Sequence, residues 1–471
     1  MKIFKTVFVL ECRILRRDRA AMTVLAVFAG FLLVAAFAGG RHAGALEESF
    51  LKIEHEQSSR LSNLRNELEK LTGSNAVLGN QDPRNTVWMA QEGAAQFALL
   101  PPAPLAPIAM GQRDLHPQAV RVTNNVHLIR ERETETPMAG PTRLRTGPFD
   151  PAFLFVVLFP LVIIALTYEL LSGERERGTL AMLLSQPVSQ SALVMGKAAA
   201  RGWVLSLVTL VLAVAGLAVA GAELRGGTAW AHVGLYLLVL VLWSAFWFAM
   251  AIAVNSRGGT SARNALVLVG LWLVVVVIVP GLFNAGVNSI YPPPSRVELL
   301  HEAREATQEV EAELTGLVGR HDVNPKRGAL AKKVVQVQDE LANRSEPVLE
   351  ELHAQLQKRQ GLMGWLQYLS PAILVQLALE DVAGSGATRH QRFQAQADTY
   401  HRKFRAFFSA RIQGGGMFSP KDFDALPLFR FEEAGLGGVA WRVSTSCGVL
   451  LLAVLVLLMF ARPGLRRIGR Q

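Results

Sequence analysis

Residues 151–180 read PAFLFVVLFPLVIIALTYELLSGERERGTL, an apolar run that changes abruptly into alternating charges. About 20 apolar residues in a helix match the thickness of a bilayer core. Helix is the conformation expected there, because unpaired backbone groups are costly in hydrocarbon. The stretch therefore predicts a membrane-spanning helix followed at once by a segment outside the membrane.

Similar apolar runs recur along the chain. Half of its 471 residues are hydrophobic, which argues against an ordinary soluble domain. Pro160, inside one run, predicts a kink. The predicted fold class is an all-α membrane protein with six transmembrane helices and two large, mainly helical extracytoplasmic insertions; the helices are expected at 20–39, 151–171, 200–221, 230–254, 264–283 and 438–460.

Basic residues beside these runs indicate the orientation. They are dense in the amphipathic segment 1–19, in 172–199, between the fourth and fifth runs, and in the tail 461–471, whereas the short loop 222–229 has only Arg225. By the positive-inside rule both termini and residues 172–199 are cytoplasmic. This placement of the net charge of +10 favours a membrane over nucleic acid, and we expect a multi-pass protein of a bacterial cytoplasmic (inner) membrane.

The first run has a second interpretation. A basic start, an apolar stretch and Ala36-Phe37-Ala38 resemble a signal peptide with a cleavage site. The run is longer than the apolar part of most signal peptides, which favours an uncleaved anchor. Cleavage would leave the remaining topology unchanged.

The insertions at 40–150 and 284–437 are predicted to lie outside the cytoplasm. In the first, Leu61, Leu64, Leu68 and Leu71 repeat at steps of three and four, which indicates an amphipathic helix. Neither insertion shows a nucleophile motif or metal-ligand spacing, so no enzyme, cofactor or metal is expected. His390 and His401, 11 residues apart in a polar stretch of the second, are interpreted as facing solvent.

The charged segment 172–199 has two physical interpretations. Its charges lie where the second helix ends, Pro187 stops the short helix that follows, and Lys197 leads into the third span. It is either a simple re-entry loop with a snorkelling lysine or a docking surface. Periodicity alone does not choose between them.

A resemblance does favour docking. The runs ELLSGERERGTL (169–180), LLSQPVS (183–189) and LVMGK (193–197) resemble the segment between the second and third helices of ABC type-2 transporter permeases. The resemblance implies that this segment contacts an ABC ATPase subunit. The residues it implies for coupling are Glu174, Arg175, Glu176, Arg177, Gly178, Thr179, Leu180, Pro187 and Lys197.

The second insertion carries a further resemblance. LSPA (369–372) and LPLF (426–429) look like a subgroup of these permeases with two long extracytoplasmic loops. The whole chain would then be a permease subunit of an exporter, acting as a homodimer or with a related permease. Membrane lipid and an extracytoplasmic protein are the further partners considered.

The energy source is expected in another chain. Gly196-Lys197 is followed by Ala198 and lacks the earlier glycine of a P-loop, so ATP must be hydrolysed by a separate subunit. The alternative function is a membrane-anchored sensor or scaffold whose outer helices recruit a partner protein. A neighbouring gene for an ABC ATPase would favour transport, and the sequence names no substrate.

Overall fold

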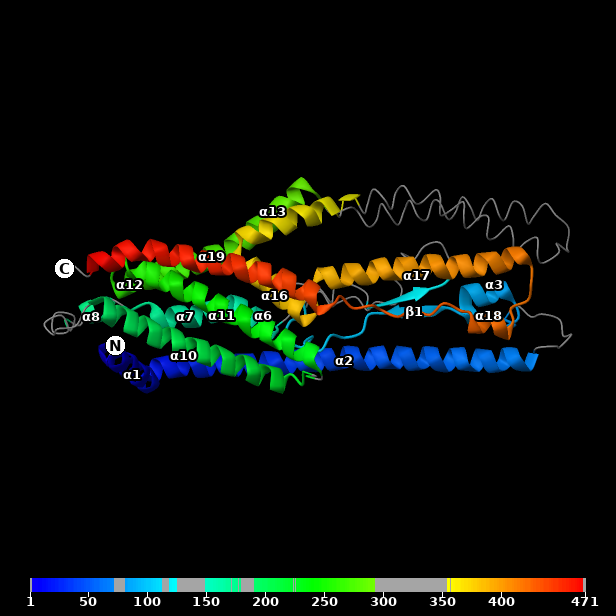
Figure 1. Cartoon of the computed structure of the whole chain (residues 1–471), viewed down its shortest axis with the longest axis horizontal. Helices are drawn as coiled ribbons and strands as arrows, with labels where there is room; N and C mark the ends of the chain where they lie inside the picture. The colour runs from blue at the N-terminus through cyan, green and yellow to red at the C-terminus, as the bar shows by residue number, and fades with distance from the viewer. Residues whose placement is uncertain are drawn as a thin grey trace.

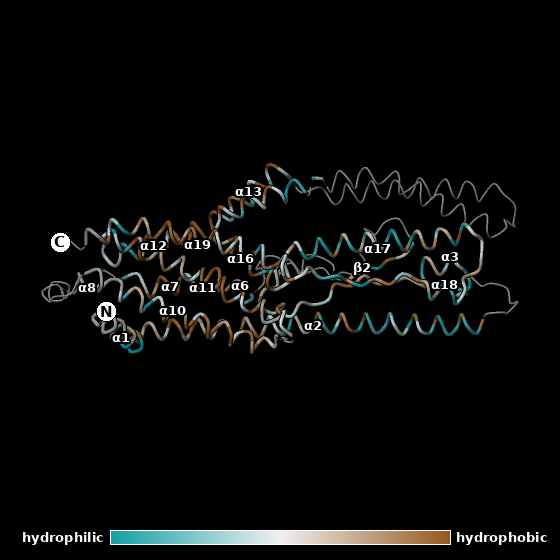
Figure 2. Tube along the Cα trace, viewed as in Figure 1, coloured by the Kyte–Doolittle hydropathy of each residue, from teal (hydrophilic) through white to brown (hydrophobic). Residues whose placement is uncertain are grey.

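The computed structural model describes residues 2–71, 81–111, 118–124, 149–170, 172–176, 178, 190–222, 224, 226–292, 354–355 and 357–468. The molecule is elongated, and both termini lie at one end, which we call the termini end (Figure 1). At the other end is a domain of helices and a β-hairpin, which we call the extramembrane domain. Apolar residues dominate the half with the termini, and polar residues are frequent in the other (Figure 2).

The apolar half is a helix bundle. Among the described residues five helices are long and apolar enough to cross a membrane. A shorter apolar helix, Pro151–Thr167, packs among them through α7 (Phe159–Thr167), which contacts α2, α11 and α12. The five are α2 (Arg19–Leu71), α10 (Gln190–Val219), α11 (Gly227–Asn255), Ser261–Ile290, which comprises α12 (Ser261–Trp272), η4 (Leu273–Ile278) and α13 (Val279–Ile290), and α19 (Leu436–Ile468).

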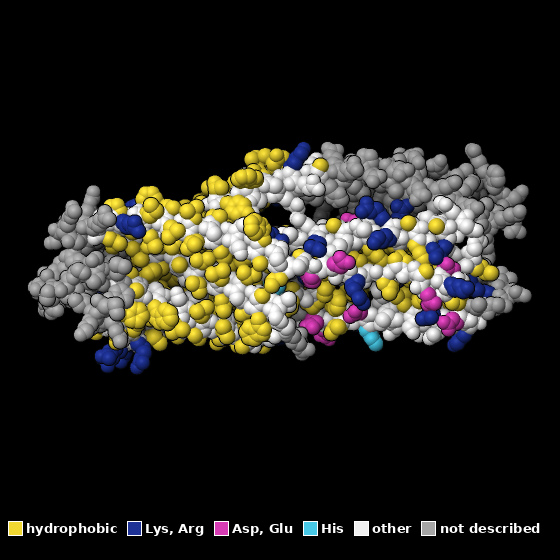
Figure 3. All heavy atoms as spheres, in the orientation of Figure 1, with side chains coloured by type: hydrophobic (Ala, Val, Ile, Leu, Met, Phe, Trp, Pro, Cys, Tyr) yellow, Lys and Arg dark blue, Asp and Glu magenta, His cyan; other side chains and the backbone are white. Residues whose placement is uncertain are grey.

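The surface of this bundle is suited to lipid. Large apolar side chains such as Leu266, Leu452 and Phe460 are more than half exposed. They form a broad apolar surface that ends where the charged side chains of the extramembrane domain begin (Figure 3). The prediction of an all-α membrane protein is confirmed, and the predicted span boundaries stay predictions.

Helix α2 joins the two halves of the molecule. It has 53 residues, so at about 1.5 Å per residue it is roughly 80 Å long, far more than the bilayer core requires. The first predicted span and the predicted leucine-rich outer helix are thus parts of one helix. Leu68, from the leucine repeat, is 1% exposed in the core of the extramembrane domain.

Pro160 coincides with a wide helical turn. The apolar helix begins with α6 (Pro151–Phe153), widens in the π-helical turn η3 (Leu154–Leu158) and continues as α7. Proline has no N–H, so carbonyls of the preceding turn lack their helical donor. Indole N–H groups supply donors in this turn, because Trp243 donates to Phe155 O at 3.0 Å and Trp272 to Val157 O at 2.9 Å.

The extramembrane domain has an aromatic core. Helix α17 (Ala387–Gly414) turns Phe393, Phe404 and Phe408 inward, and all three are fully buried. They pack on the outer half of α2 and on an antiparallel hairpin in which Gln96 pairs with Val122. The remaining elements are β1 (Gln96–Leu99), β2 (Ala119–Val122), α3 (Thr86–Trp88), η1 (Met89–Gly93) and α18 (Pro420–Asp424).

The outer edge of β1 is covered by α2. Gln57 accepts a hydrogen bond from the backbone N–H of Phe97 at 2.6 Å, and Arg60 donates to the carbonyl of Ala95. An uncovered strand edge is a template for unwanted pairing. The hairpin, which the sequence did not predict, is therefore fixed to the long helix by side chains.

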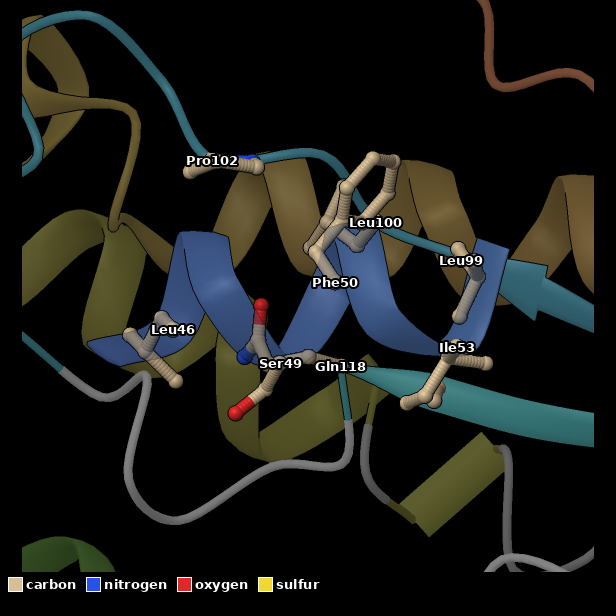
Figure 4. Close-up of a pocket in the computed structure, with 9 residues that line it drawn as sticks. Leu46, Ser49, Phe50, Ile53, Leu99, Leu100, Pro102 and Gln118 are labelled. Carbon is tan, nitrogen blue, oxygen red and sulfur yellow. The ribbon is translucent and has the colours of Figure 1, made fainter. Parts of the chain in front are cut away.

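A small apolar hollow lies between α2 and the hairpin (Figure 4). Its volume is about 70 Å³. Its lining residues are Leu46, Ser49, Phe50, Ile53, Leu99, Leu100, Pro102, Gln118 and Ala119.

One interpretation of the second insertion is wrong. His390 and His401, expected to face solvent, are 8% and 7% exposed. The ring of His390 lies 6.0 Å from that of Phe393, a residue of the core. The polar residues around them hid the inward face of α17, because apolar residues recur there only at every third or fourth position.

A candidate coupling site at the termini end

Those predicted coupling residues that the structure describes lie in α8, just after it and in α10, at the termini end. Glu174, Arg175 and Glu176 belong to the short helix α8 (Ser172–Glu176), and Gly178 follows with a φ of 69°, a conformation that favours glycine. Lys197 is half-buried in α10. The side chains of Glu174 and Arg175 are outside the described part of the chain, as are Arg177, Thr179, Leu180 and Pro187, so their roles stay predictions.

Glu176 contacts the start of another helix. Its carboxylate accepts a hydrogen bond from the backbone N–H of Ser261 at 2.6 Å. Ser261 is the first residue of α12, where backbone N–H groups have no helical acceptor and the helix dipole favours negative charge. Helices α8 and α12 are joined by this bond.

Ser172 makes a second link between the same helices. Its hydroxyl lies 2.7 Å from the hydroxyl of Ser261 and accepts a bond from the Asn264 side chain at 3.5 Å. Ser172 and Asn264 are 4% and 2% exposed. The contact between α8 and α12 thus combines the exposed bond of Glu176 with the buried polar groups of Ser172 and Asn264.

Asn255 extends this network to α7. Its amide nitrogen donates to the carbonyls of Ala251 and Thr167, and its amide oxygen accepts from Asn264 at 3.1 Å. Asn255 is 1% exposed and lies at the end of α11. Since a buried polar group without partners costs free energy, its three bonds specify one arrangement of α7, α11 and α12.

Arg201 binds the neighbouring residue at the same end of α7. It donates to the carbonyl of Leu166 at 2.7 Å and forms an ion pair with Glu11 at 2.8 Å. The two charged side chains are 12% and 4% exposed. Helix α10, the amphipathic helix α1 (Lys2–Arg17) and α7 meet at this one guanidinium.

The end of α7 is therefore the point where both contacts converge. The last carbonyls of a helix have no helical donor, and here Leu166 receives Arg201 while Thr167 receives Asn255. Side chains from α10 and α11 thus hold adjacent residues of α7. We call the set formed by Glu11, Leu166, Thr167, Ser172, Glu176, Arg201, Asn255, Ser261 and Asn264 the polar joint.

Sequence reasoning identified one side chain of this joint for coupling, Glu176. Arg201 lies at the start of the third predicted span and Glu11 is one acid in a basic helix, and neither was expected to take part in coupling. Asn255 follows the last residue of one apolar run and Asn264 is the first residue of the next. A polar amide in such a position could have been recognised in the sequence as a candidate for a buried contact. Their pairing depends on how the helices cross, which spacing along one chain does not give.

Comparison with known proteins adds the family. The family described as ABC-2 family transporter protein matches residues 6–462. The chain belongs to this family. In this family the ATPase is a separate subunit.

Two relatives are named probable ABC transporter permease protein NosY. The protein of Pseudomonas aeruginosa is 30% identical over 128 residues, which are 26% of this chain and 46% of the relative. That of Stutzerimonas stutzeri is 31% identical over 133 residues, 27% and 47% of the two chains. This chain thus matches about half the length of these curated relatives, and their similarity alone assigns it no cargo.

Proposed function

We propose that this chain is the membrane subunit of an ABC exporter, and that the polar joint transmits the movement of an ATPase subunit into the membrane helices. The bond between Glu176 and the N-terminus of α12 carries the proposal. It connects the segment for which the family resemblance implies ATPase contact to a helix of the bundle. The termini end is then the cytoplasmic side.

The joint suits transmission because its contacts are directional. A displacement of α8 acts on α12 through Glu176 and Ser172, and on α7 through Asn264 and Asn255. Movements of this kind are rigid-body shifts of packed helices between discrete arrangements. The wide turn before Pro160 gives the bundle a place where α7 moves relative to α6.

The partners follow from the same proposal. An ABC ATPase docks on 172–199, and a second permease, identical or related, completes the pathway. The extramembrane domain lies on the far side of the membrane, where it handles cargo or a partner protein. The bilayer, a bacterial inner membrane, surrounds the apolar half.

Co-purification with the cognate ATPase tests the proposal. The double variant Glu174→Lys/Glu176→Lys should insert normally, yet lose ATPase binding or the ATP hydrolysis that the permease stimulates. The matched control is Glu54→Lys/Glu56→Lys, which reverses the same charges at exposed positions on the outer half of α2. Unchanged assembly and activity in the first variant would remove the coupling assignment.

A further inference from the structure

Helix α1 has a buried face and an exposed face. Glu11, 3% exposed, faces α10 and forms the ion pair with Arg201. At about 3.6 residues per turn, Arg13, Arg16 and Arg17 lie on the side opposite Glu11, and all three are exposed. The helix is therefore fixed to the bundle on one side and presents cations on the other.

Apolar side chains flank these arginines. Val9, Leu10 and Ile14 are 48%, 54% and 49% exposed. On an interfacial helix whose exposed side carries both kinds of residue, long arginine side chains reach the phosphates while the apolar side chains enter the acyl region. Exposed apolar residues next to cations match a phospholipid leaflet better than a purely acidic protein surface.

The acidic residue next to Arg16 and Arg17 already accepts hydrogen bonds from the backbone. Asp18 accepts hydrogen bonds from the backbone N–H groups of Ala20 and Ala21 at 2.9 and 3.2 Å, so it caps α2. Throughout the described residues no ion pair joins Arg13, Arg16 or Arg17 to an acidic side chain. Lysine and arginine side chains gather beside α1 at the termini end (Figure 3).

We propose that the exposed face of α1 binds anionic phospholipid headgroups of the leaflet at the termini end. The planar guanidinium groups of Arg13, Arg16 and Arg17 pair with lipid phosphates, while Val9, Leu10 and Ile14 enter the acyl region. The Glu11–Arg201 ion pair fixes this lipid-bound helix to the carbonyl of Leu166. The lipid thereby holds the end of α7 in place, a consequence that rests on the proposed function of the polar joint.

Fluorescence quenching tests the lipid preference. A Val9→Cys probe in a Cys12→Ser/Cys447→Ala background carries an environment-sensitive dye, and the permease alone is placed in nanodiscs. Headgroup spin-labelled phosphatidylglycerol should quench the dye several-fold more than spin-labelled phosphatidylcholine at equal content. Added salt should reduce this difference, because ionic strength screens exposed charges.

Two triple variants distinguish an effect of the arginines on α1 from an effect of positive charge elsewhere in the chain. Arg13→Gln/Arg16→Gln/Arg17→Gln should abolish the preference for the anionic lipid. Arg402→Gln/Lys403→Gln/Lys421→Gln, which removes three exposed charges from the extramembrane domain, should retain it. A preference that survives the first variant, or one that is insensitive to salt, would overturn the proposal.

The same variants distinguish this proposal from the proposed function. The quenching experiment contains neither ATPase nor nucleotide, so its result stands even if coupling through 172–199 fails. Loss of ATPase binding in the Arg13/Arg16/Arg17 variant, with the lipid preference intact, would show that the face docks an acidic protein and would also overturn the proposal.

Discussion

The polar joint and the aromatic core of the extramembrane domain hold helices together by opposite means. The joint uses single hydrogen bonds and one ion pair, each with a defined direction. The aromatic core uses rings of α17 such as Phe404 and Phe408, whose centroids lie 4.8 Å apart. Apolar contact is non-directional and grows with buried area, whereas a hydrogen bond is lost when its partners shift slightly.

This difference separates support from transmission. A packed aromatic core resists any change of shape, because a vacated volume is costly. A polar joint ties pairs of helices in a defined direction, so a displacement of one helix is passed to the next. The extramembrane domain is thus expected to move as a rigid body, and the termini end to rearrange within the bundle.

The largest expected effect is in the aromatic core. Phe404→Ala removes a fully buried ring and should lower the free energy of unfolding of the extramembrane domain by about 4 kcal/mol. Hydrogen exchange of the full chain in nanodiscs measures this, with faster exchange expected in α17 and unchanged exchange in α11. Equal exchange in α17 of the wild type and of the Phe404→Ala variant would show that the domain has no packed core.

Arg201→Gln should have the next largest effect. It leaves Glu11 buried without its cation, and breaking such a pair costs about 3 kcal/mol. Exchange should increase at α1 and at the end of α7, and stimulated ATP hydrolysis should fall. The control Arg402→Gln removes an exposed charge and should change neither; an effect of equal size there would deny the ion pair a special role.

Asn255→Leu tests the amide network with a smaller effect. The change keeps the approximate side-chain volume, but it removes the group that donates to Thr167 O and the oxygen that accepts from Asn264. It should therefore lower the free energy of unfolding by about 1–2 kcal/mol. Thermal unfolding measures the loss, and coupling of ATP hydrolysis should weaken with it. Full coupling in a destabilised variant would mean that the network only supports the fold.

The smallest effect, and a pH dependence, is expected at Asp422. Burial raises the pKa of this carboxyl, but hydrogen bonds from Ser419 and Arg411 outweigh it and leave the pKa below the ordinary value of 3.8. Its contribution is therefore complete above that value and is lost as the pH falls through the lowered pKa.

Asp422→Ala should cost about 1 kcal/mol at neutral pH, because it removes the capping box that starts α18. The difference between wild type and variant, measured by thermal unfolding of the full chain, should shrink as the pH falls below about 4. A difference independent of pH would contradict this account of the cap.

The sequence predicted the bundle well because each span carries its own signal. Length, apolarity and basic flanks are local properties, so the runs around Pro160 and Trp243 were recognisable without a structure. The pairing of α7 with Arg201 and Asn255 was not predictable, since it joins residues 35 and 88 positions apart in the chain. The β-hairpin was missed because its strands have four residues each and an intervening segment separates them.

The coupling segment shows the same limit more sharply. Its motif drew attention to Glu176 through family resemblance, whereas the acceptor role of its carboxylate toward Ser261 depends on the fold of another helix. The burial of His390 and His401 was not predicted, because the sequence of an amphipathic helix with a narrow apolar face is similar to that of a fully solvent-exposed helix. Local patterns therefore identified elements, and contacts between elements required the structure.

A disulfide between α8 and α12 tests the central claim most directly. Ser172→Cys/Ser261→Cys, in a Cys12→Ser/Cys447→Ala background, replaces two hydroxyls that lie 2.7 Å apart. If α8 and α12 move as one body, the oxidised protein should retain ATP hydrolysis stimulated by the permease at the level of the reduced protein. Activity that disappears on oxidation and returns with reductant would show that the two helices separate during the cycle, and would contradict the account.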